Sequence, residues 1–241
     1  MSPERIHDSL SAVQGSSAFT VVRLHEGSPL LSRVAVMPAS FNPPTLAHAE
    51  LLRLALTVPG VRSAACLLTT RNVDKAPSGA TYEQRAGMLL AEPAGYPVVL
   101  VSNAARIVDQ AGALRATFPG VDFDFLVGYD TLVRVFDEAY YDEMHHELAP
   151  FFAHHRLIAA NRAEADSATV AAYLREHPAA AAFATRVVQV ELAAEHSSIS
   201  STSVRRRVAL GGSPESLLEG VAHYIAQHGL YQDDTAPKAA S

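Results

Sequence analysis

The chain has 241 residues, and its 25 acidic side chains outnumber its 19 lysines and arginines, which gives a formal net charge of −6. An acidic chain has no broad positive field for a nucleic-acid backbone, so we expect no nucleic-acid partner. No apolar run approaches the ~20 residues that cross a bilayer, and residues 1–15 lack the apolar centre of a signal peptide, so we expect no membrane association. The single cysteine, Cys66, cannot form an internal disulfide, which is typical of a reducing, cytoplasmic setting.

The first 32 residues carry two structural signals. The spacing of Ile6, Leu10 and Val13 predicts a short helix, and residues 19–24 (FTVVRL) predict a strand. From residue 33 onward, apolar runs typical of buried strands alternate with helical patterns. The predicted strands are 34–37, 62–70, 97–102, 123–128, 156–160 and 187–192. The predicted helices are 46–56, 82–90, 104–117, 131–138, 202–210 and 214–228.

This alternation is typical of a parallel sheet covered by helices on both faces, so the sequence predicts an α/β fold. We expect an N-terminal extension over residues 1–32 that can pack on the core. The main domain then spans residues 33–231, and a disordered polar tail covers residues 232–241.

The first motif lies in residues 34–48, which read VAVMPASFNPPTLAH. A buried strand is followed by a proline-containing loop at 38–44 and by a helix for which Thr45 is a good N-cap. Ligands of open α/β sheets bind at the carboxyl ends of the strands, and a helix N-terminus favours an anion. His48 lies in the first turn of that helix, where it would meet such a ligand. The alternative is an ordinary strand–helix unit in which His48 is structural.

The second motif is residues 197–207, which read SSISSTSVRRR. Hydroxyl groups gather before a helix whose first turns are basic, which suits phosphate binding. By composition alone, the favoured alternative is an N-cap with more hydroxyl groups than capping requires, followed by an exposed basic face, because serine and threonine caps are common. If both motifs bind phosphate, their two helix starts face one pocket and hold a triphosphate between them.

Together the two motifs resemble a known family. Residues 40–48 (SFNPPTLAH) resemble the GSFxPxxxGH signature, and residues 199–205 (ISSTSVR) resemble the ISSTxIR motif, of the nicotinamide- and nicotinate-nucleotide adenylyltransferases. Residues 221–225 and 229–231 resemble that family's C-terminal helix and its closing Leu-Tyr. The resemblance implies a Rossmann-like, doubly wound parallel sheet. Ala39 and Ala47 stand where the family has glycine, so each adds a methyl group close to the expected ATP.

The resemblance also assigns roles to individual residues. His48 would donate a hydrogen bond to the α-phosphate, and Arg205 would neutralise the departing pyrophosphate. The catalytic set it implies is Thr45, His48, Lys75 and Arg205. The implied contacts to ATP and its phosphates are Ser40, Phe41, Asn42, Gly128, Asp130, Arg162, Ser200, Ser201 and Thr202. The implied substrate contacts are Thr81, Arg85 and Tyr129.

Several of these positions keep a structural alternative. Asp130 can be a simple N-cap, Lys75 an exposed loop lysine, and Arg85 a surface arginine. The second substrate is the weakest part of the match, because the chain has no tryptophan and residues 103–112 lack the family's SYT-like stretch. A tyrosine such as Tyr129 could stack on a pyridine ring instead.

The activity that the resemblance implies joins the AMP part of ATP to nicotinamide or nicotinate mononucleotide, giving NAD or deamido-NAD and pyrophosphate. Mg²⁺ would bridge the phosphates with mostly water ligands, so no protein metal site is expected. The alternatives are pantetheine-phosphate, FMN or cytidylyl transfer on the same fold, or a degenerate protein that binds ATP and hydrolyses it slowly. The expected partners are ATP and a mononucleotide, and self-association stays open.

Four histidines form two adjacent pairs near Asp142 and Glu143. They are His145, His146, His154 and His155. Neighbouring side chains point apart on most backbones, and no cysteine lies among them. We therefore predict a solvated loop here rather than a metal site.

Overall fold

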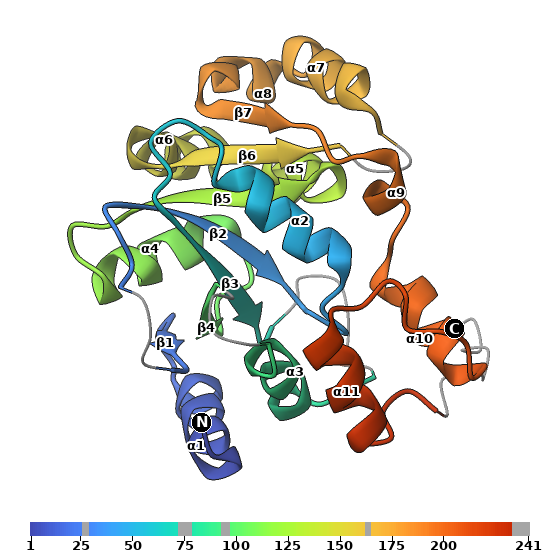
Figure 1. Cartoon of the computed structure of the whole chain (residues 1–241). Helices are drawn as coiled ribbons and strands as arrows, with labels where there is room; N and C mark the ends of the chain where they lie inside the picture. Colours follow the sequence, from blue (N-terminus) through green and yellow to red (C-terminus); the bar gives the residue numbers. More distant parts are fainter. Residues whose placement is uncertain (26–28, 72–78, 93–96, 162–164, 233–241) are drawn as a thin grey trace.

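The computed structural model describes residues 1–25, 29–71, 79–92, 97–161 and 165–232. A seven-stranded sheet forms its centre, in the order β1-β4-β3-β2-β5-β6-β7 (Figure 1). The strands are β1 (Val21–Arg23), β2 (Arg33–Ala39), β3 (Ser63–Thr69), β4 (Val98–Ser102), β5 (Asp122–Gly128), β6 (Arg156–Ala160) and β7 (Val187–Val190). All neighbouring strands are parallel except β1, which pairs with β4 antiparallel. The predicted doubly wound α/β fold is confirmed.

Helices cover both faces of the sheet, because each strand is apolar on both sides. On β2, Val34 and Val36 belong to one core, and Ala35 and Met37 belong to the other. The first core is covered by α4 (Ile107–Thr117), α5 (Tyr129–Val135), α6 (Met144–His154), α7 (Ser167–Glu176) and α8 (Pro178–Ala182). The second core is covered by α1 (Pro3–Gly15), α2 (Leu46–Ala55) and α3 (Tyr82–Leu90). None of the helices in the described ranges has the length and apolar character to cross a membrane.

A third, smaller core holds the C-terminal helices against α3. It joins α10 (Ser201–Ala209) to α11 (Glu219–Gln227) through Val204, Val221 and Ile225, with Met88 of α3 among them. The short helix α9 (Ala194–Ser197) precedes α10 and packs beside α2 (Figure 1). This third core therefore determines where the second sequence motif lies.

The N-terminal residues extend the same sheet. The predicted helix at Ile6–Val13 is α1, which packs on α3, and the predicted strand at 19–24 is the shorter β1 at the sheet edge. Asn103 fixes the segment between them, because its Oδ1 accepts from Thr20 N–H (2.8 Å) and its Nδ2 donates to the carbonyl of Ala18 (3.0 Å). Residues 1–25 thus share their core with the rest of the chain.

Several predicted boundaries differ from the structure, and specific contacts explain four of them. β2 continues through Pro38 to Ala39, because its pairing with β5 has already ended at Val36 and no ladder donor is needed on that side. Helix α4 begins at Ile107, since the Ser102 side chain accepts from Ala104 N–H (3.1 Å) and holds a turn there.

The other two boundaries lie beside the functional residues. Helix α5 begins at Tyr129 with Gly128 as its N-cap, so the interpretation of Asp130 as the cap is wrong. Helix α11 begins at Glu219 rather than at 214, because the carbonyl of Ser216 accepts from Leu46 N–H (2.9 Å) and draws that segment across the start of α2.

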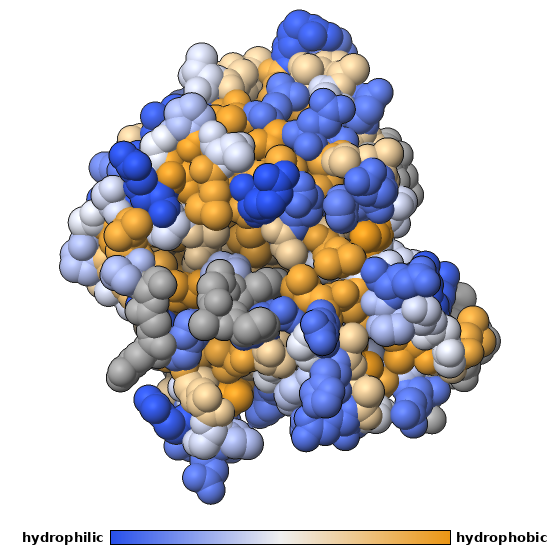
Figure 2. All heavy atoms as spheres, viewed as in Figure 1, coloured by the Kyte–Doolittle hydropathy of each residue, from blue (hydrophilic) through white to orange (hydrophobic). Residues whose placement is uncertain are grey.

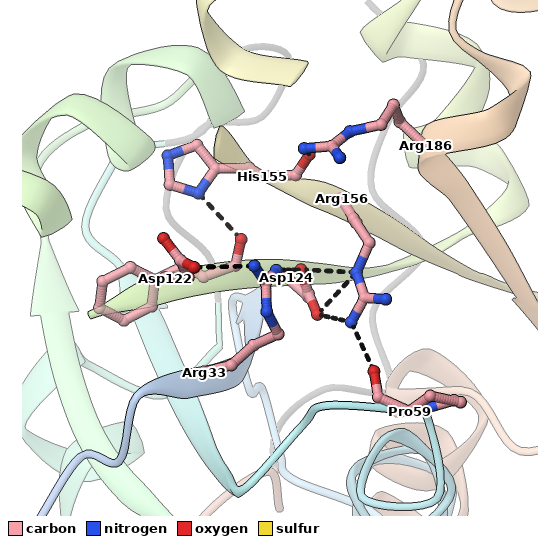
Figure 3. Close-up of polar contacts among 8 residues, drawn as sticks. Arg33, Pro59, Asp122, Asp124, His155, Arg156 and Arg186 are labelled. Atoms are coloured by element: carbon pink, nitrogen blue, oxygen red, sulfur yellow. Dashed lines mark hydrogen bonds and ion pairs between the residues drawn. The ribbon is translucent and has the colours of Figure 1, made fainter. Parts of the chain in front are cut away.

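A charged network joins β2, β5 and β6 at their amino ends, away from the carboxyl edge (Figure 3). The completely buried carboxylate of Asp124 accepts from Arg33 Nη1 (2.8 Å) and from Arg156 Nε (3.1 Å). Arg33 also pairs with Asp122 (2.7 Å), and Arg156 donates to the carbonyl of Pro59 (3.0 Å). Because Asp124 meets two guanidinium groups, its buried charge is compensated and the three strands keep their register.

The large exposed apolar side chains lie in separate segments outside the helices and strands, and they are Met1, Phe19, Leu31, Leu56 and Leu210. On the face shown in Figure 2, apolar residues are interspersed with polar ones. Scattered apolar side chains of this kind are normal for a protein surface. We therefore look for function in the cavity at the carboxyl edge of the sheet.

Candidate nucleotide-binding site

A cavity of about 260 Å³ opens at the carboxyl ends of β2, β5 and β6. The strand order reverses between β2 and β5, which is where ligands of open α/β sheets bind. These two strands are paired only as far as Val36 and Phe125, so their ends diverge and leave room. The polar side chains in the wall are His48, Asp130, Thr131, Arg134, Asn161, His196, Ser197, Ser200 and Ser201.

His48 reaches the cavity from the first turn of α2. Its Nδ1 accepts from the backbone N–H of Thr45 (3.1 Å), and the Thr45 hydroxyl oxygen lies 2.8 Å from the same nitrogen. A neutral imidazole that accepts at Nδ1 carries its hydrogen on Nε2. The local fold therefore makes Nε2 the hydrogen-bond donor of this ring. Thr45 itself is completely buried and does not line the cavity.

The loop before α2 is held by buried contacts. Phe41 adopts a positive φ of 44°, is 1% exposed, and packs its ring 5.3 Å from that of His48. The Asn42 side chain accepts from Ala80 N–H (3.2 Å) and from the Tyr231 hydroxyl (2.9 Å). Ser40 is half-buried, and its carbonyl accepts from Arg85. The side chains of Phe41 and Asn42 thus shape the loop.

Helix α10 docks directly onto that loop. The Ser201 hydroxyl donates to the carbonyl of Pro43 (2.9 Å), and Arg205 Nη1 donates to the carbonyl of Asn42 (2.7 Å). Ser200 and Ser201 line the cavity with His48, so the two motifs meet across about 150 residues of chain. Thr202 and Arg205 lie on the same helix but outside the cavity wall, with Arg205 Nη2 3.4 Å from the Thr202 hydroxyl.

The fourth predicted strand also delivers its residues to the cavity. Gly128 ends β5 and Asp130 lies in the first turn of α5, and both line the wall. A Cβ placed on Gly128 would meet no described atom within 4 Å. The glycine thus leaves space on the cavity side of the sheet.

The predicted substrate residues Thr81, Arg85 and Tyr129 lie outside the cavity wall. Thr81 caps α3, where its hydroxyl accepts from Gln84 N–H (3.2 Å). Arg85 is buried, so the surface interpretation is wrong, and burial lowers the pKa of its guanidinium. Its Nε donates to the carbonyl of Ala80 (2.8 Å), and Tyr129 packs edge-on against Tyr173.

Two predicted phosphate ligands, Lys75 and Arg162, lie outside the described residues.

The predicted histidine loop is wrong: His145, His146 and His154 are exposed on α6, whereas His155 is buried directly after it. The His155 Nδ1 lies 2.9 Å from the carbonyl oxygen of Phe123, and burial lowers the pKa of the ring to about 4. Within the described ranges, no cluster of three or more His, Cys, Asp or Glu could hold a metal ion.

Among the wall residues that sequence reasoning missed are Arg134, Leu192 and His196. Arg134 follows Asp130 by one helical turn, a spacing that could have indicated it. The sequence predicts Leu192 only as the last residue of a strand, which the structure ends at Val190, and His196 lies in the four-residue helix α9, which is too short for a periodic signal.

Comparisons with known proteins agree with the resemblance that the two motifs carry. No family model matches the chain. Over 144 residues it is 31% identical to a Schizosaccharomyces pombe protein named "Putative nicotinamide mononucleotide adenylyltransferase", a match that covers 56% of this chain and 55% of that protein. The chain thus matches about half the length of this curated relative.

Two solved structures share the fold. Both are Plasmodium falciparum nicotinic acid mononucleotide adenylyltransferase, complexed with NaAD in one and with APC in the other. Their TM-scores are 0.62 and 0.59 at 15% identity, and each superposition covers 83% of this chain and 97% of that one. The chain is thus similar in sequence, over about half of each chain, to a protein named as a putative nicotinamide mononucleotide adenylyltransferase, and similar in fold to a nicotinic acid mononucleotide adenylyltransferase.

Proposed function

We propose that the chain transfers the AMP part of ATP to nicotinamide or nicotinate mononucleotide. A phosphate oxygen of the mononucleotide attacks the α-phosphorus of ATP. The new bond joins the two phosphates, the bond from the α-phosphorus to the bridging oxygen breaks, and pyrophosphate leaves. The products are NAD or deamido-NAD and pyrophosphate.

One observation supports this proposal above the others. His48 of α2 and Ser200 and Ser201 of α10 lie in the wall of one cavity, at the point where the strand order reverses. Each of these residues belongs to the first turn or cap of a helix, where backbone N–H groups and the helix dipole favour an anion. Two such helix starts suit a triphosphate.

His48 is the residue to which we assign charge stabilisation at the reacting phosphate. Its Nε2–H would donate to an α-phosphate oxygen as negative charge builds there. Thr45 acts through His48, because its buried backbone N–H and hydroxyl hold Nδ1. We keep Lys75 as the residue that steadies the attacking phosphate and Arg162 as a phosphate ligand.

The remaining groups would bind the ends of ATP. Asp130 can accept from ribose hydroxyls, and Gly128 allows the sugar to approach the sheet. The pyrophosphate would extend from Ser200 and Ser201 along the first turn of α10 towards Arg205. Asp130 is the single carboxylate among the described residues of the wall, so Mg²⁺ would enter with ATP on its phosphate oxygens and waters.

The second candidate function is slow ATP hydrolysis by a nucleotide-binding protein. The specific observation in its favour is that Ala39 and Ala47 both line the cavity. Their methyl groups occupy space beside the expected phosphates, where glycine would leave more room. Restoring glycine at both positions should raise turnover if these methyl groups restrict ATP.

The test is to incubate the protein with ATP, Mg²⁺ and one acceptor at a time, and to identify products by mass. The acceptors are the two pyridine mononucleotides, pantetheine phosphate and FMN, and a parallel series uses CTP. We expect a pyridine dinucleotide and an equal amount of pyrophosphate. Formation of ADP and phosphate alone would favour the second candidate, and a different adduct would name another acceptor.

The same assay tests His48. We expect His48→Ala to lower kcat by about 10²–10³-fold, the usual cost of losing one donor at a developing charge. The unfolding midpoint, measured alongside, should stay close to that of the unsubstituted protein. A variant with near-normal turnover would contradict the assigned role.

A further inference from the structure

Arg134 lies in the cavity wall, and the proposed chemistry gives it no task. Among the described residues of this wall it is the single lysine or arginine. Its side chain is exposed, so a ligand in the cavity can reach it. A guanidinium keeps its positive charge across the physiological pH range. The wall thus contains one permanent cation, and this cation belongs to neither sequence motif.

Helix α5 presents Arg134 to the cavity. Leu132 and Val135 are buried in the first core and anchor one face of the helix. Asp130 and Arg134 are one helical turn apart, so their side chains share the opposite face, and both line the cavity. A long side chain on a helix leans towards the N-terminus of that helix. Arg134 therefore leans back towards the carboxyl edge of the sheet, where α5 begins.

The opposite side of the cavity is apolar. Helix α5 covers the first core, whereas α2 covers the second and α9 packs beside α2. Leu51 of α2 and Ile199, which follows α9, therefore reach the cavity from the other face of the sheet. Leu192 lies between the two sides, and the Asn161 side chain fixes its backbone by accepting from its N–H (2.5 Å) and donating to its carbonyl (3.1 Å). A cation on one side thus faces fixed apolar side chains on the other.

These two sides suit a flat, neutral heteroaromatic ring. Apolar side chains can contact one face of such a ring, and a guanidinium can stack on the other. The N–H donors of a guanidinium lie in its plane, so Arg134 can keep a hydrogen bond at its edge while its face stacks. The carboxylate of Asp130, one turn away, would repel a phosphate here, whereas it would not repel a neutral base.

We propose that Arg134 binds the purine base of ATP by stacking its guanidinium on the ring, with Leu192 and Ile199 on the opposite face. This inference rests on the proposed function, because it uses ATP as the occupant of the cavity. There the phosphates lie at the starts of α2 and α10 and Asp130 holds the ribose, so the base comes next along α5. A purine offers more stacking surface than a pyrimidine, so Arg134 sets a preference for ATP over CTP.

The test measures nucleotide binding by calorimetry, without an acceptor and without turnover. Arg134→Ala should weaken ATP binding about tenfold, as for one lost cation–π contact. The loss should be equal for AMP, ADP and ATP, because all three carry the same base. Ribose 5-triphosphate, which lacks the base, should bind both proteins equally. The ratio of ATP affinity to CTP affinity should be lower in the variant.

Controls separate stacking from charge and from folding. Arg134→Lys keeps the charge but offers no flat group, so it should recover only a small part of the affinity. Arg175→Ala removes an exposed arginine of α7 outside the cavity wall, and it should leave every affinity unchanged. The urea midpoint of Arg134→Ala without ligand should stay close to normal, because the side chain is exposed and alanine is a good helix former.

Three outcomes would overturn the inference. They are ATP affinity within about twofold of normal in Arg134→Ala, a loss that grows with the number of phosphates, and full recovery in Arg134→Lys. A protein that binds ATP but makes no dinucleotide would contradict the proposed function and leave this binding test intact. A protein that binds no nucleotide would contradict both.

Discussion

A single buried hydroxyl connects the first motif to its chemistry. The Thr45 hydroxyl oxygen lies 2.8 Å from His48 Nδ1, and Thr45 has no exposed surface. Its influence on a ligand therefore passes through the orientation and tautomer of the imidazole. This is the role of a positioning residue, and it differs from the direct contact that the motif alone implied.

Thr45→Val keeps the shape of this side chain and removes the hydroxyl. We expect kcat to fall about tenfold with little change in the KM for ATP, because one of two contacts to Nδ1 remains in the backbone N–H. Steady-state kinetics measure both constants, and Thr45→Ser should restore kcat. Equal kcat in the valine and serine variants would contradict a role for the hydroxyl.

At the scale of elements, the C-terminal helices hold the loop before α2 from outside the sheet. Helix α11 packs on α3, and Tyr231, which follows α11, donates to Asn42 in the loop. Arg205 of α10 donates to the same residue. The position of the loop therefore depends on how closely α11 approaches α3.

Gly220 allows that close approach. A Cβ at this position would clash with the carbonyl oxygen of Ala91, a backbone atom that cannot move aside cheaply. We expect Gly220→Ala to lower the free energy of unfolding by about 1–3 kcal/mol, the usual cost of overpacking. It should also lower kcat/KM, because displacing α11 shifts Tyr231, which follows this helix.

Gly112→Ala provides a matched control in α4. Its Cβ would meet no described atom within 4 Å, and alanine is the better helix former, so this variant should gain about 0.5–1 kcal/mol. Urea unfolding measures both changes. A Gly220→Ala protein as stable as the control would show that α11 can shift without cost.

At the scale of the whole molecule, the carboxyl and amino edges of the sheet differ in structure. At the carboxyl edge, the ends of β2 and β5 line the cavity. The amino edge instead carries a network of ion pairs and a buried histidine (Figure 3). Asp124 joins Arg33 to Arg156 there, and His155 lies beside β5 through its contact with Phe123.

His155 makes the stability of this edge depend on pH. Burial lowers its pKa from 6.5 to about 4, so the unfolded chain takes up a proton near pH 6.5 while the folded chain does not. The unfolded state then binds more protons, and the stability of the fold falls as the pH drops from 6.5 towards 4. We expect this group to cost about 2–3 kcal/mol at pH 4.5 relative to pH 7.

His155→Asn isolates that contribution. An asparagine amide can still donate to the carbonyl of Phe123, but it does not titrate. Urea unfolding at pH 7 and at pH 4.5 should show a smaller loss of stability in the variant than in the unsubstituted protein. The same loss in both proteins would contradict the assignment to His155.

The order of strands and helices follows from local patterns, and most of the predicted elements are confirmed. Some boundaries failed because a distant group decided them. Ser216, for example, accepts from Leu46 and delays the start of α11. Such contacts join residues that no sequence window contains together.

The sequence by itself determined the α/β class, the helix start at Thr45, and the presence of two motifs whose residues suit phosphate. These features are local, because periodicity and capping act over a few residues. Only the tertiary structure decided that Thr45 is buried behind His48, that Arg205 braces the loop, and that His196 enters the cavity wall. Those facts depend on packing between distant segments, which fixes the contacts that a one-dimensional pattern does not encode.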